Sequence, residues 1–253
     1  MIETESCMLL FDYWKDPLSG SDKDNPPLLS LLDKGKPIFI FVSHHHKDHF
    51  SRRIFLWQQR FPEIQYIISE DVRKAVNYML KEDSTYAGFK PAKESVHILS
   101  PGDSFKDSLI NIKAYPSTDI GNSYVVECDG MRFFHAGDLN AWLWIDESTE
   151  KEISEARTQY IEILDGIRSD YEEFTLVMFP VDSRLGTEYY WGARYFVHKF
   201  RCDLFVPMHF ELVMDERDKE QRRLDAGVFE KYANTTYGDY LQLSATRSSY
   251  MKG

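Results

Sequence analysis

The sequence predicts an α/β fold, and two observations support that prediction. Short runs of β-branched and aromatic residues have the length of buried strands, as in PIFIFVS at 37–43 and FTLVMFPV at 174–181. Segments with helical spacing of apolar residues separate such runs, for example at 70–82 and 148–167. Strands that alternate with helices are typical of sheets covered by helices on their faces.

The first part of the chain alternates strands with helices. We expect these elements in the order strand 7–13, strand 37–43, helix 51–61, strand 64–69 and helix 70–82. A loop rich in Pro, Gly, Ser and Asp covers 16–27, and Ser69 is a candidate N-cap for the second helix. The strand at 37–43 is too apolar to have a face in water.

The pattern changes between residues 96 and 135 and then returns to alternation. Four short apolar runs separated by turns such as CDGM predict an antiparallel meander from VHILS to MRFFHA. The elements expected after it are helix 148–167, strand 174–181, helix 187–200, strand 203–210 and a charged helix at 216–232. Because no linker-like change of composition follows residue 27, we expect one domain over residues 1–253.

Composition narrows the classes of partner. A formal net charge of -11 opposes nucleic-acid binding, which needs clustered Lys and Arg. No apolar run reaches the roughly 18 residues of a membrane helix. Three widely spaced cysteines, Cys7, Cys128 and Cys202, suit a reducing cytoplasm better than a disulfide framework. We therefore expect a cytoplasmic protein with a small-molecule substrate and neither a nucleic-acid nor a membrane partner.

The segment SHHHKDHF, directly after the strand at 37–43, is the strongest functional signal. It places His44, His46, Asp48 and His49 in a loop at the end of a buried strand, where α/β sheets commonly bind ligands. Imidazole and carboxylate groups suit zinc, iron or manganese. A fortuitous surface cluster or a tag fragment is the alternative, which the preceding strand and the interleaved Asp disfavour. We expect His45, between two candidate ligands, to point away from them.

Two later strand ends carry further candidate ligands. FFHAGDLN places Asp138 after a glycine that permits close backbone approach, and DLFVPMHF places His209 at the end of a buried strand. Taken singly, Asp138 could be a turn residue and His209 a buried structural histidine. The order HxHxDH, then GD, then a strand-end His resembles the metallo-β-lactamase-fold hydrolases over essentially the whole chain. The segments FHAGDLN, STDIG and FPVDSR are most similar to a bacterial branch distantly akin to the ascorbate-phosphate lactonases.

This resemblance implies a fold and a site. The fold is an αββα four-layer sandwich, here expected to lack its first N-terminal strand because the chain starts almost inside the matching segment. One or two zinc ions are implied, with Mn²⁺ or Fe²⁺ as alternatives, and a hydroxide held between two ions would be the nucleophile. Asp48 and Asp138 would have catalytic roles. The implied ligands are His44 and His46 for the first ion, Asp48, His49 and His209 for the second, and Asp138 between them.

The sequence departs from the family pattern before the GD motif. Relatives supply a third histidine to the first ion there, whereas this chain has YPSTDIGNSY with Ser117 in register. Asp119, two residues further on, is either a replacement ligand or a loop carboxylate that caps a turn. Asp12 matches a residue close to the site in relatives and is expected to orient a ligand.

Three further residues are candidates for substrate binding. Trp142 and Trp144 follow the GD motif and could line a pocket or simply be buried aromatics. Arg184 could hold a substrate carboxylate or phosphate, or could form a structural salt bridge with Asp182.

A metal-dependent hydrolase acting on a small ester, lactone or phosphoester is the function that these residues favour. The alternatives are a degenerate protein of the same fold that binds metal or ligand without turnover, and a nuclease, which the acidic charge opposes. The diiron oxidoreductases of the fold replace the second His of the motif with Glu and need a flavin partner, so His46 argues against that use.

Overall fold

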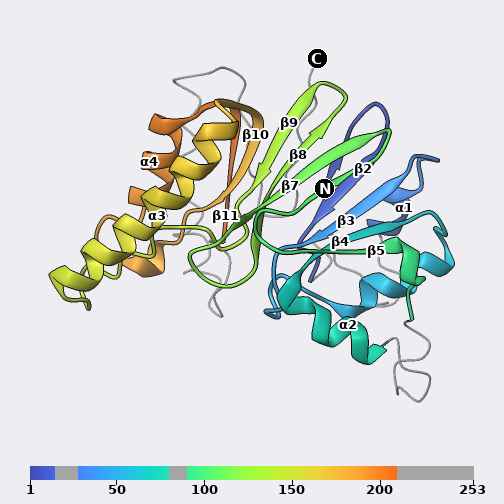
Figure 1. Cartoon of the computed structure of the whole chain (residues 1–253), viewed down its shortest axis with the longest axis horizontal. Helices are drawn as coiled ribbons and strands as arrows, with labels where there is room; N and C mark the ends of the chain where they lie inside the picture. Colours follow the sequence, from blue (N-terminus) through green and yellow to red (C-terminus); the bar gives the residue numbers. More distant parts are fainter. Residues whose placement is uncertain (15–27, 80–89, 210–253) are drawn as a thin grey trace. The chain divides into compact units, whose positions relative to one another are not determined.

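Runs of β-branched and aromatic residues form the strands of two β-sheets in the computed structural model, with helices packed on them (Figure 1). The structure describes residues 1–14, 28–79 and 90–209. The loop predicted at 16–27 and the helix predicted at 216–232 lie entirely outside these residues. In the described part of the chain, no helix combines the length and the apolar character that crossing a membrane requires.

The chain divides into two compact units. The first contains Met1–Ala114 and Glu127–Gly130, and the second contains Tyr115–Val126 and the described residues from Met131 on. The expectation of one domain over the whole chain stays a prediction.

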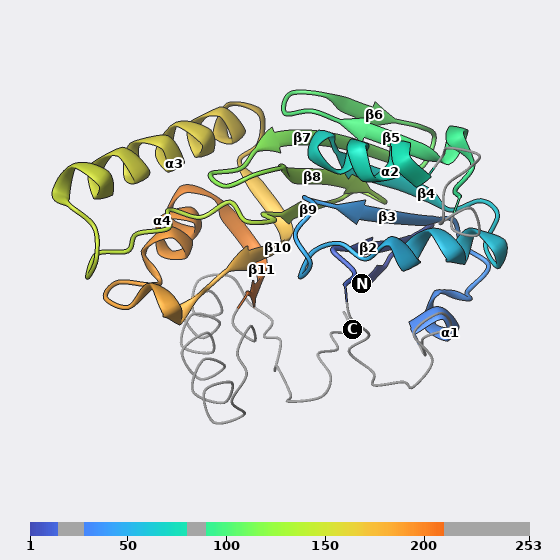
Figure 2. The ribbon, with the colours of Figure 1, turned by 90° about the horizontal axis from the view of Figure 1, so that it is seen from below.

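The first unit is built on a five-stranded sheet in which the strands follow chain order, as Figure 2 shows for β2 to β5. The short strand β1 is antiparallel to β2, and the other pairs are parallel. All five residues of β3 are buried, which confirms the prediction of a strand without a wet face. The strands are β1 (Ile2–Glu3), β2 (Met8–Phe11), β3 (Ile38–Val42), β4 (Gln65–Ser69) and β5 (Val96–Leu99).

Helices of the first unit pack on one face of this sheet. Their apolar side chains join a core with alternate strand residues such as Ile40 and Tyr66. The segment predicted as helix 51–61 is a 3₁₀ helix, and the helix predicted at 70–82 begins as a 3₁₀ turn and continues as α-helix to Met79. Ser69 does precede that turn, but its hydroxyl binds the Asp71 carboxylate instead of capping the backbone. The helical elements are α1 (Leu28–Leu32), η1 (Arg52–Gln59), η2 (Glu70–Val72), α2 (Arg73–Met79) and η4 (Lys93–Ser95).

The predicted antiparallel meander is wrong at its first strand. VHILS forms β5, which pairs parallel with β4 in the first sheet. The reason is the connection between them, because a strand that returns after a helix such as α2 is placed parallel to its predecessor. The next strand, β6 (Ser104–Lys106), was not among the four predicted runs, and it pairs antiparallel with β7 (Ile110–Pro116), which was.

The second sheet has the strand order β11-β10-β9-β8-β7-β6. Its later strands are parallel, with β10 between β9 and β11. The predicted strands at 174–181 and 203–210 are confirmed with small shifts in their bounds. These strands are β8 (Asn122–Cys128), β9 (Met131–His135), β10 (Glu173–Pro180) and β11 (Arg201–Met208).

Two α-helices cover one face of β9, β10 and β11 (Figure 1). The first, α3 (Glu150–Asp170), starts with a capping box between Thr149 and Glu152, and the second is α4 (Trp191–Lys199). The Tyr160 hydroxyl donates a hydrogen bond of 2.7 Å to the Gly192 carbonyl and so joins the two helices. Both helices were predicted, at 148–167 and 187–200. The core between helices and strands is rich in aromatic residues, among them Phe134, Phe174, Phe179 and Phe196.

Candidate metal centre

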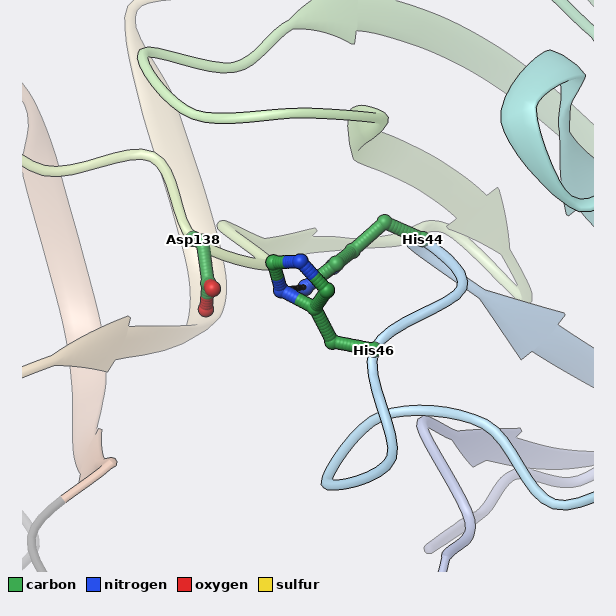
Figure 3. A group of neighbouring side chains, drawn as sticks. All are labelled: His44, His46 and Asp138. Carbon is green, nitrogen blue, oxygen red and sulfur yellow. Dashed lines mark hydrogen bonds between the residues drawn. The ribbon is translucent and has the colours of Figure 1, made fainter.

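The loop after β3 brings the imidazoles of the first unit together. His44 is fully buried and His46 is exposed, and Nε2 of His44 lies 2.9 Å from Nδ1 of His46. Figure 3 draws both side chains leaving this loop. Two imidazole nitrogens that face each other at this distance either share a proton or point to one cation, since tetrahedral zinc holds its nitrogen ligands roughly 3.3 Å apart.

Asp12 and Ser43 fix the orientation of two of these histidines. Asp12, at the end of β2, accepts hydrogen bonds from the Ser43 backbone N–H (2.7 Å) and the Ser43 hydroxyl (2.6 Å). Because the hydroxyl proton points to Asp12, the Ser43 oxygen accepts from Nδ1–H of His44 at 3.0 Å. Nδ1 of His49 lies 2.7 Å from Asp12. Both imidazoles therefore present Nε2 as the ligand atom, and Asp12 makes the contact expected of an orienting residue.

The remaining polar residues of this loop separate into two groups. Asp48 Oδ2 lies 3.6 Å from Nε2 of His49, so these two side chains face each other. His45 is exposed, and both its backbone N–H and its Nδ1 contact the Asp71 carboxylate at 2.8 Å. His45 thus interacts with a different carboxylate from His49, but its ring centroid also lies 5.2 Å from that of His46, and its bystander role stays a prediction.

The second unit brings Asp138 and His209 together. Asp138 is on the loop after β9, as Figure 3 shows, and follows Gly137, whose φ is 55°. His209 directly follows β11. Nε2 of His209 lies 3.6 Å from Oδ1 of Asp138, and both side chains are buried. Two residues that were predicted as ligands from different strand ends therefore lie beside each other.

Asp182 holds the other nitrogen of His209, a role that sequence reasoning missed. Its Oδ2 lies 2.9 Å from Nδ1 of His209, and its two oxygens also accept from Nε of Arg184 at 3.0 and 2.8 Å. Burial alone would raise the pKa of Asp182, but the hydrogen bonds from His209 and Arg184 outweigh it and hold that pKa well below its ordinary value. Pro180 of β10 pairs with Met208 of β11, so the residues after both strands emerge at one edge. That register was the signal that could have linked Asp182 with His209.

The candidate substrate-binding residues have different surroundings. Arg184 forms the salt bridge with Asp182 that was the alternative to substrate binding. Trp142 donates from Nε1 to the Asp138 carbonyl at 2.7 Å, and its ring lies edge-on to His209 with centroids 5.5 Å apart. Trp142 therefore contacts both residues of this half of the site, whereas Trp144 is an exposed aromatic. Their binding of a substrate stays a prediction.

The segment STDIG is tied to the loop that carries Asp138. The Thr118 hydroxyl donates to the Asn140 carbonyl at 2.6 Å and accepts from the Asn140 N–H at 3.0 Å. Asp119 is exposed, and its backbone N–H donates to the Ser117 hydroxyl at 3.3 Å. These bonds fix the backbone of the segment, and the role of Asp119 as a ligand stays a prediction.

Left-handed backbone is concentrated at the candidate site. Of the five non-glycine residues with positive φ in the described chain, Asp129 and Glu188 lie in turns elsewhere, and Asp12, Trp142 and His209 have φ of 44°, 47° and 68°. Such conformations cost about 1–3 kcal/mol each and persist where the surrounding structure enforces them. All three belong to the hydrogen-bonded groups described above, which is typical of functional sites.

Comparison with known proteins gives a fold and no close relative. No family model and no curated protein matches the chain. CmlA, a diiron β-hydroxylase from Streptomyces venezuelae, is 11% identical to this chain, with a TM-score of 0.57. The match covers 90% of this chain and 47% of the CmlA chain. A mutant of CmlA gives the same identity and TM-score, and its match covers 92% of this chain and 48% of the mutant's chain. The chain thus spans about half the length of these structures.

A putative Zn-dependent hydrolase of the metallo-β-lactamase superfamily from Thermotoga maritima also matches, with 14% identity, a TM-score of 0.35, and coverage of 72% of this chain and 64% of its own. With two sheets and their helices, and the likeness to CmlA, the chain has the metallo-β-lactamase fold. The expected α/β class with two sheets is therefore confirmed, whereas the four-layer arrangement and the missing first strand stay predictions. The relation to ascorbate-phosphate lactonases stays a prediction.

Proposed function

We propose that this protein is a metal-dependent hydrolase that acts on a small ester, lactone or phosphoester. One observation carries the proposal. In each unit a histidine that follows a strand, on its loop or directly at its end, has its Nδ1 against a largely buried aspartate side chain, His49 with Asp12 and His209 with Asp182. Carboxylates that hold one nitrogen of a histidine in this way are characteristic of metal-binding histidines, because they fix the tautomer and raise the basicity of the other nitrogen.

The donor set fits a divalent metal. We propose that zinc is the metal, bound as one ion or two. Imidazole nitrogen and carboxylate oxygen are common zinc ligands, and they also suit iron and manganese. In this proposal His44 and His46 would hold the first ion, Asp48, His49 and His209 would hold the second, and Asp138 would contribute to both.

The chain's own residues would then bind, orient and polarise. When bound, the metal would lower the pKa of a water molecule and polarise the substrate oxygen. Asp48 would orient the attacking water by accepting its hydrogen bond, while Asp12 and Asp182 hold His49 and His209 in place. Trp142, through its contacts with Asp138 and His209, would hold these two residues in position.

A second candidate function is oxidation at a pair of iron ions. The likeness to CmlA favours it, since that protein is a diiron β-hydroxylase and its TM-score is above 0.5. The carboxylates proposed as ligands are compatible with iron as well as zinc. The identity of the bound metal separates the two candidates, because hydrolysis with zinc needs no redox change.

The test starts from protein purified without a tag. Metal analysis should find about one or two zinc ions per chain, and a screen of p-nitrophenyl phosphate esters, acyl esters and lactones should find turnover that a chelator removes. Two iron ions per chain with no hydrolysis would favour the oxidative candidate. Fully metallated protein that turns over none of these substrates and contains no iron would leave the non-catalytic alternative.

Replacement of Asp119 by alanine is expected to lower the metal content per chain. The reason is that STDIG has no histidine for the first ion, and Asp119 is the nearest strong ligand in that segment. Metal analysis of the variant beside the native protein provides the measurement. Asp107, an exposed loop aspartate that caps the turn at Leu109, offers a matched Asp→Ala control. Unchanged stoichiometry in Asp119→Ala would mean that Asp119 only shapes its loop.

Replacement of Asp182 by asparagine is expected to weaken metal binding about 10- to 100-fold. The change keeps the shape of the side chain but removes the negative charge beside Nδ1 of His209. Competition with a chelating dye measures the affinity. Asp146→Asn is the matched control and should leave the metal affinity unchanged. Asp146 lies in a loop of the same unit and accepts a hydrogen bond from the Thr187 N–H. Equal affinity in both variants would contradict the orienting role of Asp182.

A further inference from the structure

Two of the three cysteines, far apart in the sequence, meet inside the first unit. Cys7 precedes β2 and Cys128 is the last residue of β8, 121 positions further along the chain. Both are buried, and their sulfur atoms lie 3.0 Å apart. Cys202 is in the second unit, where its sulfur approaches the Phe200 carbonyl at 3.8 Å.

The segments that carry Cys7 and Cys128 are held together by bonds that do not involve sulfur. Asp129 accepts from the Ser6 backbone N–H at 2.8 Å and from the Ser6 hydroxyl at 2.6 Å. These bonds lower the pKa of Asp129 to about 2, so the carboxylate stays charged at neutral pH. The Thr4 hydroxyl lies 3.4 Å from the Cys7 sulfur and 3.5 Å from the Cys128 sulfur. The two thiols are thus kept side by side by the fold itself.

We propose that Cys7 and Cys128 are a site of disulfide formation under oxidising conditions. A disulfide bond is about 2.05 Å long, so the sulfur atoms need to approach by about 1 Å. With glutathione disulfide as oxidant, one cysteine thiolate attacks the glutathione disulfide and releases a glutathione thiol. The second cysteine then attacks the mixed disulfide and releases the other. The two protein thiols are oxidised to one disulfide, and one glutathione disulfide is reduced to two thiols.

Burial determines when this reaction occurs. Removal from water raises the pKa of Cys128 to about 12, so little thiolate exists in the folded protein at neutral pH. Exchange is therefore expected mainly during folding, when both thiols are in water and the thiolate forms readily. Once the bond is made, its burial protects it from reductants in solution.

Oxidative refolding tests the proposal with the full-length chain. The denatured, reduced protein is refolded with a mixture of reduced and oxidised glutathione, and its peptides are mapped without reduction. We expect the Cys7 and Cys128 peptides to be joined with the loss of two hydrogens. The Tm should exceed that of the reduced protein by about 10 °C, because the bond closes a long loop.

Three cysteine variants identify the bond. Cys202→Ser should keep the joined peptides and the rise in Tm, whereas Cys128→Ala and Cys7→Ala should each lose both, and either alanine variant suffices if the other does not fold. Three free thiols after oxidative refolding would overturn the proposal. A bond to Cys202, or one between two chains, would also overturn it. These outcomes do not depend on bound metal and leave the proposed hydrolase function untouched.

Discussion

Replacing His49 with alanine is expected to remove one metal ion per chain and to lower the affinity for it by more than about 100-fold. The effect should exceed the 10- to 100-fold loss typical of residues that only orient a ligand, because an imidazole ligand itself disappears. The cost also includes the surroundings of His49. Asp12 loses the Nδ1 contact of 2.7 Å, and Asp48 loses its neighbour at 3.6 Å. Metal analysis and calorimetric titration of the metal-free protein provide the measurements.

His45 offers a matched control in the same loop. His45→Ala removes an exposed imidazole whose Nδ1 contacts Asp71 and whose ring lies edge-on to His46, so metal content and affinity should stay those of the native protein. A loss of metal in His45→Ala equal to that in His49→Ala would show that the loop binds metal as an unspecific histidine cluster. Native metal content in His49→Ala would contradict the assignment of His49.

The fold could be predicted where local sequence decides the structure. The apolar run that forms β3 has no hydrophilic face, so its burial follows from composition alone. β5 could not be placed in this way, because a short strand pairs with whichever neighbour the tertiary fold offers. The connection through α2 makes β5 parallel to β4, and nothing inside VHILS records that choice.

The candidate site divides in the same way. His44, His46, Asp48 and His49 lie within six residues, so the sequence shows their chemistry directly. The contact between Asp182 and His209 spans 27 positions and depends on the register of β10 against β11. The pairing of Cys7 with Cys128 spans 121 positions, and counting cysteines gave no sign of it. Contacts set by strand register leave no spacing that a single sequence can reveal.

Removal of the metal with a chelator is expected to lower the Tm by roughly 8–16 °C and to abolish turnover. A ligand that binds only the folded state stabilises it by about 4 kcal/mol when its concentration is 1,000 times its Kd. For chains of this size, each kcal/mol shifts the Tm by roughly 2–4 °C. Electrostatic repulsion is also expected to lower the Tm of the metal-free protein. A chain with a net charge of -11 loses positive charge beside Asp48 and Asp138 when the ion leaves.

Calorimetric scans of native and chelated protein measure the shift, and one equivalent of zinc should restore the Tm where the same amount of magnesium does not. The His49→Ala variant sharpens the measurement, because it should start from a lower Tm and respond less to the chelator. Metal-free protein that melts at the native temperature would mean that the ions do not stabilise the folded state. The carboxylate and imidazole pairs, Asp12 with His49 and Asp182 with His209, would then hold the histidines in place without any ion.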